Sequence, residues 1–294
     1  MRKLRTLSLF AGIGGFDLGL ERTGGFETVA FCEIDPFCQE VLAKHWPNVP
    51  CFSDVRELRG EQVGDIDVIC GGFPCQDLST AGKQAGMDEG TRSGLWSEIV
   101  RLTGELRPSF LLVENVAALL SGPSEQRGGW FGRVLGDLAA IGYDAEWHCI
   151  PASYVGARHR RDRVWILAYP ASIGTRREND AGQSFVIDKS GGGVAERRIE
   201  NVADVAGERQ SRSGQPIFPI CEKTGNCRET IGAFSSRVGS IWRAEPDVGR
   251  VANGVPRRVD RLRSLGNAVV PQIPELIGHA ILADIGWTPN KVTE

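Results

Sequence analysis

The sequence contains no run of about 18 apolar residues, the length that a membrane-spanning helix needs. It begins with basic residues and an apolar stretch, but Asp17 and Glu21 interrupt that stretch and no small-residue cleavage pattern follows. Both absences argue against a membrane anchor and a secretory leader. We therefore expect a soluble protein of the cytoplasm with no membrane partner.

Metal-ligand spacing is also lacking. The eight cysteines form no C-x-x-C pair, and no histidine stands at ligand spacing, so the sequence predicts no metal site. Because disulfides are rare in the cytoplasm, we expect reduced thiols. No internal repeat is present.

Net charge is small, at −3, but it is unevenly distributed. Residues 1–150 hold 13 Lys and Arg against 21 Asp and Glu, whereas residues 151–270 hold 20 against 13. Most of the basic residues in the second segment are arginines, which suit phosphates and base edges. By charge alone, nucleic-acid binding and an exposed basic surface are equally compatible with this pattern.

Short apolar runs alternate with amphipathic segments along most of the chain. We expect helices over 36–46, 95–107 and about 274–285. The predicted strands cover 4–10, 28–34, 66–70, 110–114, 145–150 and 163–169. This alternation predicts an α/β fold, with a doubly wound, mostly parallel sheet and helices on both faces.

The composition changes after Pro170. Residues 171–245 are rich in Gly, Ser, Arg and Asn and lack strong periodicity, and order returns from Val251. This stretch is either a small irregular domain or a long insertion. We divide the chain into a main domain, 1–170 plus 254–294, and a small second domain, 171–253.

The stretch LSLFAGIGGFDLGLE, residues 7–21, predicts a strand, a glycine turn and a helix start. Gly12, Gly14 and Gly15 would let the backbone come close to a ligand. A dinucleotide fingerprint needs glycine where Asp17 stands, and a carboxylate there would repel a pyrophosphate. A ligand with a positive or zwitterionic part suits this turn better.

Two acidic residues follow the next strands. Glu33 could accept hydrogen bonds from ribose hydroxyls, and Asp54 could bind an adenine amino group. Together with the glycine turn they predict a nucleoside ligand without phosphates, for which S-adenosylmethionine is the common candidate.

The stretch DVICGGFPCQDLST, residues 67–80, leads from an apolar strand through two glycines and a Phe-Pro bend to Cys75. A stiff loop at a strand end presents a nucleophile, whereas an inert cysteine needs no such setting. Glu114 and Asn115 end another strand, and parallel strand ends share one edge, so Cys75 and Glu114 could face one crevice. The alternative for Glu114 is an acid that caps a helix.

Two arginines precede the last predicted strand, in ARHRRDRVWILAY. Strand alternation would aim Arg161 and Arg163 at one face. The alternative is an exposed basic edge strand.

In this order, the motifs resemble those of the cytosine-5 DNA methyltransferases. The matching stretches are FAGIGGF at 10–16, the acids Glu33 and Asp54, GFPCQ at 72–76, RSGLWSEIVRL around Leu95, ENV at 114–116 and GNAVVP at 266–271. The resemblance covers roughly 1–169 and 250–286. Two features depart from the family pattern: His159 stands where the arginine motif usually begins with glutamine, and GRVANGVPRRVDRLR replaces a stretch that normally ends in Arg-Leu-x-Gly-Phe-Pro.

The resemblance implies a Rossmann-like S-adenosylmethionine-dependent methyltransferase fold, with target recognition in the second domain. It assigns catalysis to Cys75, Glu114, Arg161 and Arg163, where Arg163 contacts the base and Arg161 supports it. It assigns cofactor binding to Phe10, Ala11, Gly12, Gly14, Gly15, Glu33, Ile34, Asp54, Pro74, Leu95, Asn267 and Ala268.

The implied activity is methyl transfer to C5 of a flipped-out cytosine in a specific duplex DNA sequence, through a covalent bond between Cys75 and C6. We expect a monomer that serves restriction-modification or protects phage DNA. Two alternatives remain: an RNA cytosine methyltransferase, and a catalytically silent DNA-binding protein on the same scaffold.

Overall fold

The computed structural model describes residues 1–73, 95–121, 129–171 and 256–288. Pro74, Cys75 and the predicted second domain from residue 172 onward lie outside these ranges. The strands are β1 Leu4–Leu9, β2 Phe26–Cys32, β3 Cys51–Phe52, β4 Val68–Gly72, β5 Phe110–Val116, β6 Tyr143–Pro151 and β7 Asp162–Pro170. The α-helices are α1 Gly15–Arg22, α2 Pro36–His45, α3 Trp96–Leu106, α4 Gly129–Ala140, α7 Arg258–Asn267 and α8 Gln272–Asp284. Short 3₁₀ turns cover Gly60–Gln62, Ala117–Ser121 and Ala152–Val155.

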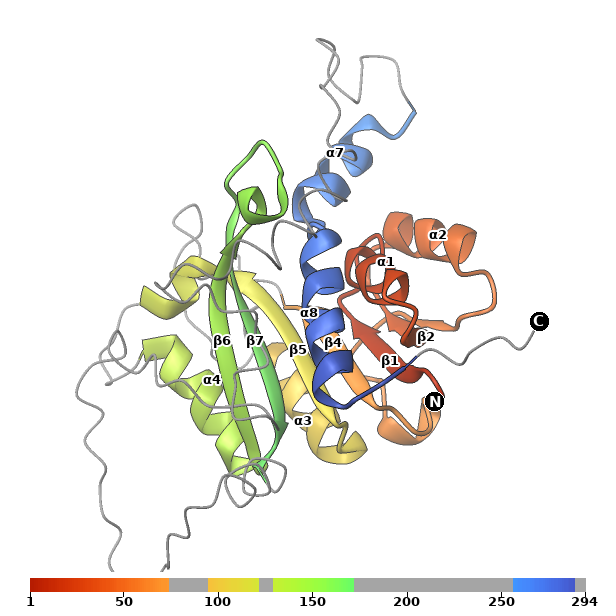
Figure 1. The fold of residues 1–294 in the computed structure, drawn as a ribbon. Helices are drawn as coiled ribbons and strands as arrows, with labels where there is room; N and C mark the ends of the chain where they lie inside the picture. The colour runs from red at the N-terminus through yellow and green to blue at the C-terminus, as the bar shows by residue number, and fades with distance from the viewer. Residues whose placement is uncertain (74–94, 122–128, 172–255, 289–294) are drawn as a thin grey trace, which may run out of the picture.

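The strands form one seven-stranded sheet in the order β3-β2-β1-β4-β5-β7-β6 (Figure 1). The five strands from β3 to β5 are parallel, whereas β7 runs antiparallel to both β5 and β6. From β1 the chain continues to β2 and β3 on one side, and it then crosses to β4 and β5 on the other side of β1. In open α/β sheets such a switch point opens a crevice at the carboxyl ends of the strands, where ligands bind.

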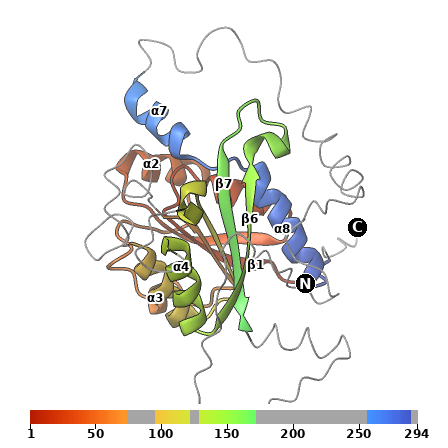
Figure 2. The same ribbon diagram turned by 90° about the vertical axis from the view of Figure 1, so that its left-hand side faces the viewer.

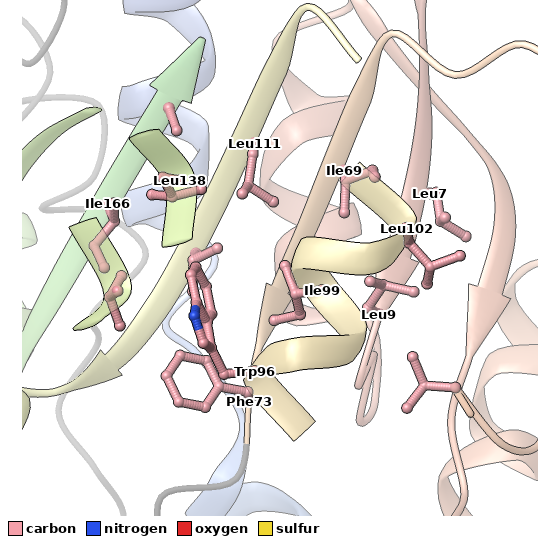
Figure 3. Packing of buried hydrophobic residues seen from close by; sticks show 14 of the residues in the cluster. Leu7, Leu9, Ile69, Phe73, Trp96, Ile99, Leu102, Leu111, Leu138 and Ile166 are labelled. Carbon is pink, nitrogen blue, oxygen red and sulfur yellow. The ribbon is translucent and has the colours of Figure 1, made fainter. Parts of the chain in front are cut away.

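Helices cover both faces of the sheet (Figure 2). On one face, α3 and α4 pack on a core that includes Leu7, Leu9, Ile69 and Leu111; Figure 3 shows Trp96, Ile99 and Leu102 of α3 over these strands. On the other face, α1 and α8 cover a second core that includes Val68 and Cys70. Neighbouring residues of β4 therefore serve opposite cores, as strand alternation requires. The predicted doubly wound fold is confirmed.

The predicted helices correspond to α2, α3 and α8 within two residues at each end. The antiparallel pair β6–β7 departs from the parallel pattern because residues 152–161 join the two strands by a connection too short for a crossover helix. The sequence reading missed β3, which has only two residues. It also missed α4, in which Phe131, Val134 and Leu138 carry the helical spacing among several glycines. Within the described ranges, no helix is long and apolar enough to cross a membrane.

Candidate active site

The glycine turn after β1 is packed on one side and open on the other. An added Cβ at Gly14 would lie 2.6 Å from the Trp46 ring, and one at Gly15 would lie 2.7 Å from Cγ2 of Val269. An added Cβ at Gly12 would meet nothing within 4 Å. Phe10 adopts a left-handed conformation with φ 52°, which costs a non-glycine residue about 1–3 kcal/mol. The open side at Gly12 leaves space for a ligand beside the turn.

Glu33 ties the end of β2 to this turn. Its carboxylate accepts hydrogen bonds from the backbone amides of Gly12 at 2.7 Å and Asp35 at 2.8 Å, and the residue is buried. The amide of Ala11 donates to the Cys32 carbonyl at 3.2 Å, beside the same strand end. A carboxylate has about four lone-pair sites, so Glu33 retains capacity for a further donor.

Ile34 and Asp54 lie near the same end of the sheet. Ile34 directly follows Glu33 and exposes 66% of its surface, an apolar side chain open to a ligand. Asp54 follows β3, and its carboxylate is bound by the Arg56 guanidinium at 2.6–3.1 Å. This contact lowers the pKa of Asp54 from its ordinary value. Asp54 therefore stays ionised, but a ligand would share it with Arg56.

The sequence had suggested that Asp17 faces a ligand at the turn. In the structure it does not lie on the open side of the turn. Its carboxylate is fully buried and accepts hydrogen bonds from the hydroxyls of Ser8 at 2.9 Å and Thr28 at 3.0 Å. Burial raises the pKa of Asp17 to about 6. The carboxylate thus packs against the sheet and does not line the turn, where the argument about pyrophosphate repulsion had placed it. Asp17 instead fastens α1 to strands β1 and β2.

The end of β4 is held closely where the chain leads to Cys75. A Cβ at Gly71 would lie 2.4 Å from the Leu9 carbonyl oxygen, so only glycine fits. The buried Phe73 ring packs on Trp96 with centroids 5.4 Å apart. Asn115 at the end of β5 donates from Nδ2 to the Phe73 carbonyl at 3.3 Å. The residue before Pro74 is therefore fixed by the neighbouring strand, a role of Asn115 that the sequence analysis did not assign.

Glu114 lies beside this strand end. It is paired in register with Gly72, where an added Cβ would lie 3.0 Å from Oε2 of Glu114. Nε of Arg163 lies 2.9 Å from Oε1 of Glu114. Burial raises the pKa of Glu114, and the guanidinium groups of Arg163 and Arg161 counteract only part of that effect. The result is a carboxyl group that takes up a proton more readily than an exposed glutamate.

Arg161 directly precedes β7, at the sheet edge where Glu114 lies, but its side chain contacts the end of α7. Its guanidinium donates to the backbone carbonyls of Gly266 at 2.8 Å, Asn267 at 3.3 Å and Ala268 at 2.9 Å. Asn267 and Ala268, which the sequence assigned to the cofactor, are thereby brought to the sheet edge that carries Glu114.

The remaining predicted positions are simpler. Leu95 directly precedes α3 and is partly buried against the same core as Phe10. His159 is exposed. Among the described residues, no group of three or more His, Cys, Asp or Glu could hold a metal ion.

The sheet order, with its switch point between β1 and β4, defines a Rossmann-like methyltransferase fold. The same architecture occurs in the crystal structure of a candidate DNA modification methyltransferase encoded within a prophage (E. coli). The two share 20% identity with a TM-score of 0.57, and the match covers 97% of this chain and 100% of that one. The model of the C-5 cytosine-specific DNA methylase family matches residues 4–218. The chain belongs to that family, which confirms the resemblance found in the sequence.

Two curated relatives are Type II methyltransferases. M2.BsuMI of Bacillus subtilis (strain 168) is 38% identical over 169 residues, which is 56% of this chain and 42% of the relative. M.Sau3AI of Staphylococcus aureus is 36% identical over 185 residues, which is 59% of this chain and 45% of the relative. The chain thus matches less than half the length of either relative.

Proposed function

We propose that this protein is a DNA (cytosine-5-)-methyltransferase that uses S-adenosylmethionine to modify cytosine in a specific sequence of duplex DNA. Membership of the family supports the reaction class. The observation that carries the proposal is Glu114, buried and with a raised pKa, paired with Arg163 beside the strand that leads to Cys75. A carboxyl group that takes up a proton readily and a guanidinium, both beside the strand that leads to Cys75, suit activation of a cytosine ring.

The cofactor fits the described turn. The open side at Gly12, the acceptor capacity of Glu33 and the exposed Ile34 suit a nucleoside. The N-terminus of α1, directly after the turn, suits a carboxylate. We propose that all the residues assigned from the resemblance hold S-adenosylmethionine: Phe10, Ala11, Gly12, Gly14, Gly15, Glu33, Ile34, Asp54, Pro74, Leu95, Asn267 and Ala268. When bound, this cofactor supplies an electrophilic methyl group to C5.

The chain's own residues would prepare C5 to accept that group. The Cys75 thiolate forms a bond to C6 of the flipped-out base, while Glu114 gives its proton to N3 so that negative charge does not build up on the ring. Arg163 holds O2. After methylation the C5 proton leaves to a base, the bond from Cys75 to C6 breaks and the thiolate departs as aromaticity returns. N3 then gives its proton back to the Glu114 carboxylate. Base flipping costs a few kcal/mol, and phosphate contacts would offset part of it.

We further propose that residues 171–253 carry target recognition. The names of the relatives favour a role in restriction-modification, and protection of phage DNA is the other role compatible with this chemistry. The protein would act as a monomer in the cytoplasm.

Transfer of labelled methyl from S-adenosylmethionine tests the proposal. We expect label in duplex DNA and not in RNA, and 5-methylcytosine at one sequence after bisulfite sequencing. Cys75→Ser should abolish transfer but retain cofactor and DNA binding, because a hydroxyl is a far weaker nucleophile near neutral pH. Label in RNA alone would identify an RNA enzyme, and DNA binding without transfer would identify a silent binding protein.

A further inference from the structure

The Arg161 side chain caps the C-terminal end of helix α7. Gly266 and Asn267 are the last two residues of α7. Their carbonyls cannot be paired within the helix, because no helical amide follows four residues further on. Ala268 after them is extended (φ −60°, ψ 141°), so the left-handed glycine motif that closes many helices is absent at this end of α7. The Arg161 guanidinium binds both carbonyls and that of Ala268 instead. A planar cation with several donors suits the negative end of a helix dipole.

The segment that Arg161 holds forms one wall of the glycine turn. Val269 is the next residue, and an added Cβ at Gly15 would lie 2.7 Å from its Cγ2 and 3.0 Å from its carbonyl oxygen. Two residues further on, the Pro271 carbonyl packs on Gly19 of α1, where a Cβ would lie 2.2 Å away. A shift of the 266–271 segment would therefore be transmitted directly to the turn and to α1.

Arg161 also lies next to the residues that we assign to the base. It directly precedes β7, whose Arg163 is bound to Glu114, and it adopts a left-handed conformation with φ 40°. Such a conformation is costly for arginine and persists only when the surroundings hold it. Its guanidinium is turned toward α7, which Figure 1 shows beside the edge of the sheet at which β7 begins.

We infer that Arg161 is a positioning residue that fixes the 266–269 wall of the cofactor turn from the strand that carries the base-contacting Arg163. This inference rests on the proposed function, and it specifies the supporting role of Arg161 as one directed at the cofactor pocket. Arg161 itself contacts backbone carbonyls and needs no contact with the base.

Arg161→Lys tests this role, because lysine keeps the charge but is a point donor without the planar fork. We expect the Kd of S-adenosylmethionine, measured by calorimetry, to rise by about tenfold or more. Hydrogen exchange of the amides of 266–269 should become faster in the variant. Arg160→Lys in the same loop is the matched control, because Arg160 is exposed and its guanidinium pairs with Asp162 of the same loop; it should change neither measurement.

Kinetics separate positioning from a general loss of structure. In Arg161→Lys the KM for the cofactor should rise, while the KM for DNA stays within about twofold of the wild-type value. The kcat, reached at saturating cofactor, should stay close to that of the wild type. An unchanged cofactor Kd, or a loss confined to DNA affinity, would overturn the inference. Calorimetry and hydrogen exchange need no methyl transfer, so wild-type protein that binds cofactor without methylating DNA would contradict the proposed function alone.

Discussion

At the scale of single residues, burial and hydrogen-bond partners determine what the two acids Glu114 and Asp17 can do. Glu114 and Asp17 are both buried with raised pKa values, but their partners differ. Glu114 faces a guanidinium at the carboxyl edge of the sheet, whereas Asp17 lies between the hydroxyls of Ser8 and Thr28. The first arrangement suits proton donation to a base, and the second suits attachment of a helix.

Glu114→Gln should lower kcat by about 10²–10⁴-fold, because the amide cannot transfer a proton. The raised pKa keeps the wild-type carboxyl protonated to a higher pH than an exposed glutamate. Wild-type kcat should therefore fall as pH rises through that pKa, and the variant should lose this limb of the profile. Glu27→Gln on an exposed position of β2 is the control. A variant with wild-type kcat would remove Glu114 from the chemistry.

Asp17 predicts a dependence of stability on pH. Its folded pKa of about 6 lies above the ordinary value of 3.8, so the folded state binds more protons between these values. Stability from this group is full below about pH 4 and is lost as pH rises through 6, a change on the order of 3 kcal/mol. Urea unfolding of wild type and Asp17→Asn at pH 5 and pH 7 measures it. The difference in unfolding free energy between the two proteins should change with pH; equal differences at both values would contradict the assignment.

At the scale of elements, two helical glycines differ in the space around them. Gly19 of α1 packs against the Pro271 carbonyl that precedes α8, with an added Cβ only 2.2 Å from that oxygen. Gly104 of α3 has nothing within 4 Å of such an atom. The first glycine is required by close packing, whereas the second only weakens its helix.

Gly19→Ala should lower the free energy of unfolding by about 1–3 kcal/mol, because backbone must move to admit the methyl group. Gly104→Ala should raise it by about 0.4–1 kcal/mol, because alanine has less freedom in the unfolded chain. Denaturant unfolding of both variants checks the pair. Equal effects would show that the contact between α1 and the 271 carbonyl is not tight.

At the scale of the whole molecule, the two junctions of the predicted recognition segment lie at opposite ends of the sheet. Ala171 follows β7, and its amide is bonded to the Gly142 carbonyl before β6. Arg257, by contrast, forms an ion pair with Glu40 of α2, and α7 ends at Arg161 by the carboxyl edge. A replacement segment must therefore enter after Ala171 and end before Arg257 to leave both attachments intact.

Exchange of residues 172–255 for those of a relative with another target should move the methylated sequence. Arginines in the segment would read guanine edges, each contact contributing about 1–3 kcal/mol of discrimination. Bisulfite sequencing identifies the target, and capture of a Cys75 adduct on 5-fluorocytosine DNA of the new sequence reports intact chemistry. Active chimeras that still methylate the original sequence would assign recognition to another part of the chain.

The sequence by itself determined the features that depend on local pattern. The strand, glycine turn and helix of residues 7–21, and the positions of Glu33 and Glu114 at strand ends, follow from hydrophobic periodicity and turn chemistry. Parallel strands share one edge, so the meeting of the β4 and β5 ends could also be predicted. These inferences need only neighbours in the chain and one rule of sheet topology.

Only the tertiary structure decided where side chains point and how burial changes their charge. Asp17 turned out to face the sheet, because Ser8 and Thr28 come from two different strands beneath α1. The partners of Arg161 lie more than a hundred residues further along the chain, in a helix that the sequence reading did not predict. A side chain's direction, hydrogen-bond partners and solvation are set by contacts between distant segments, and periodicity contains no information about those contacts.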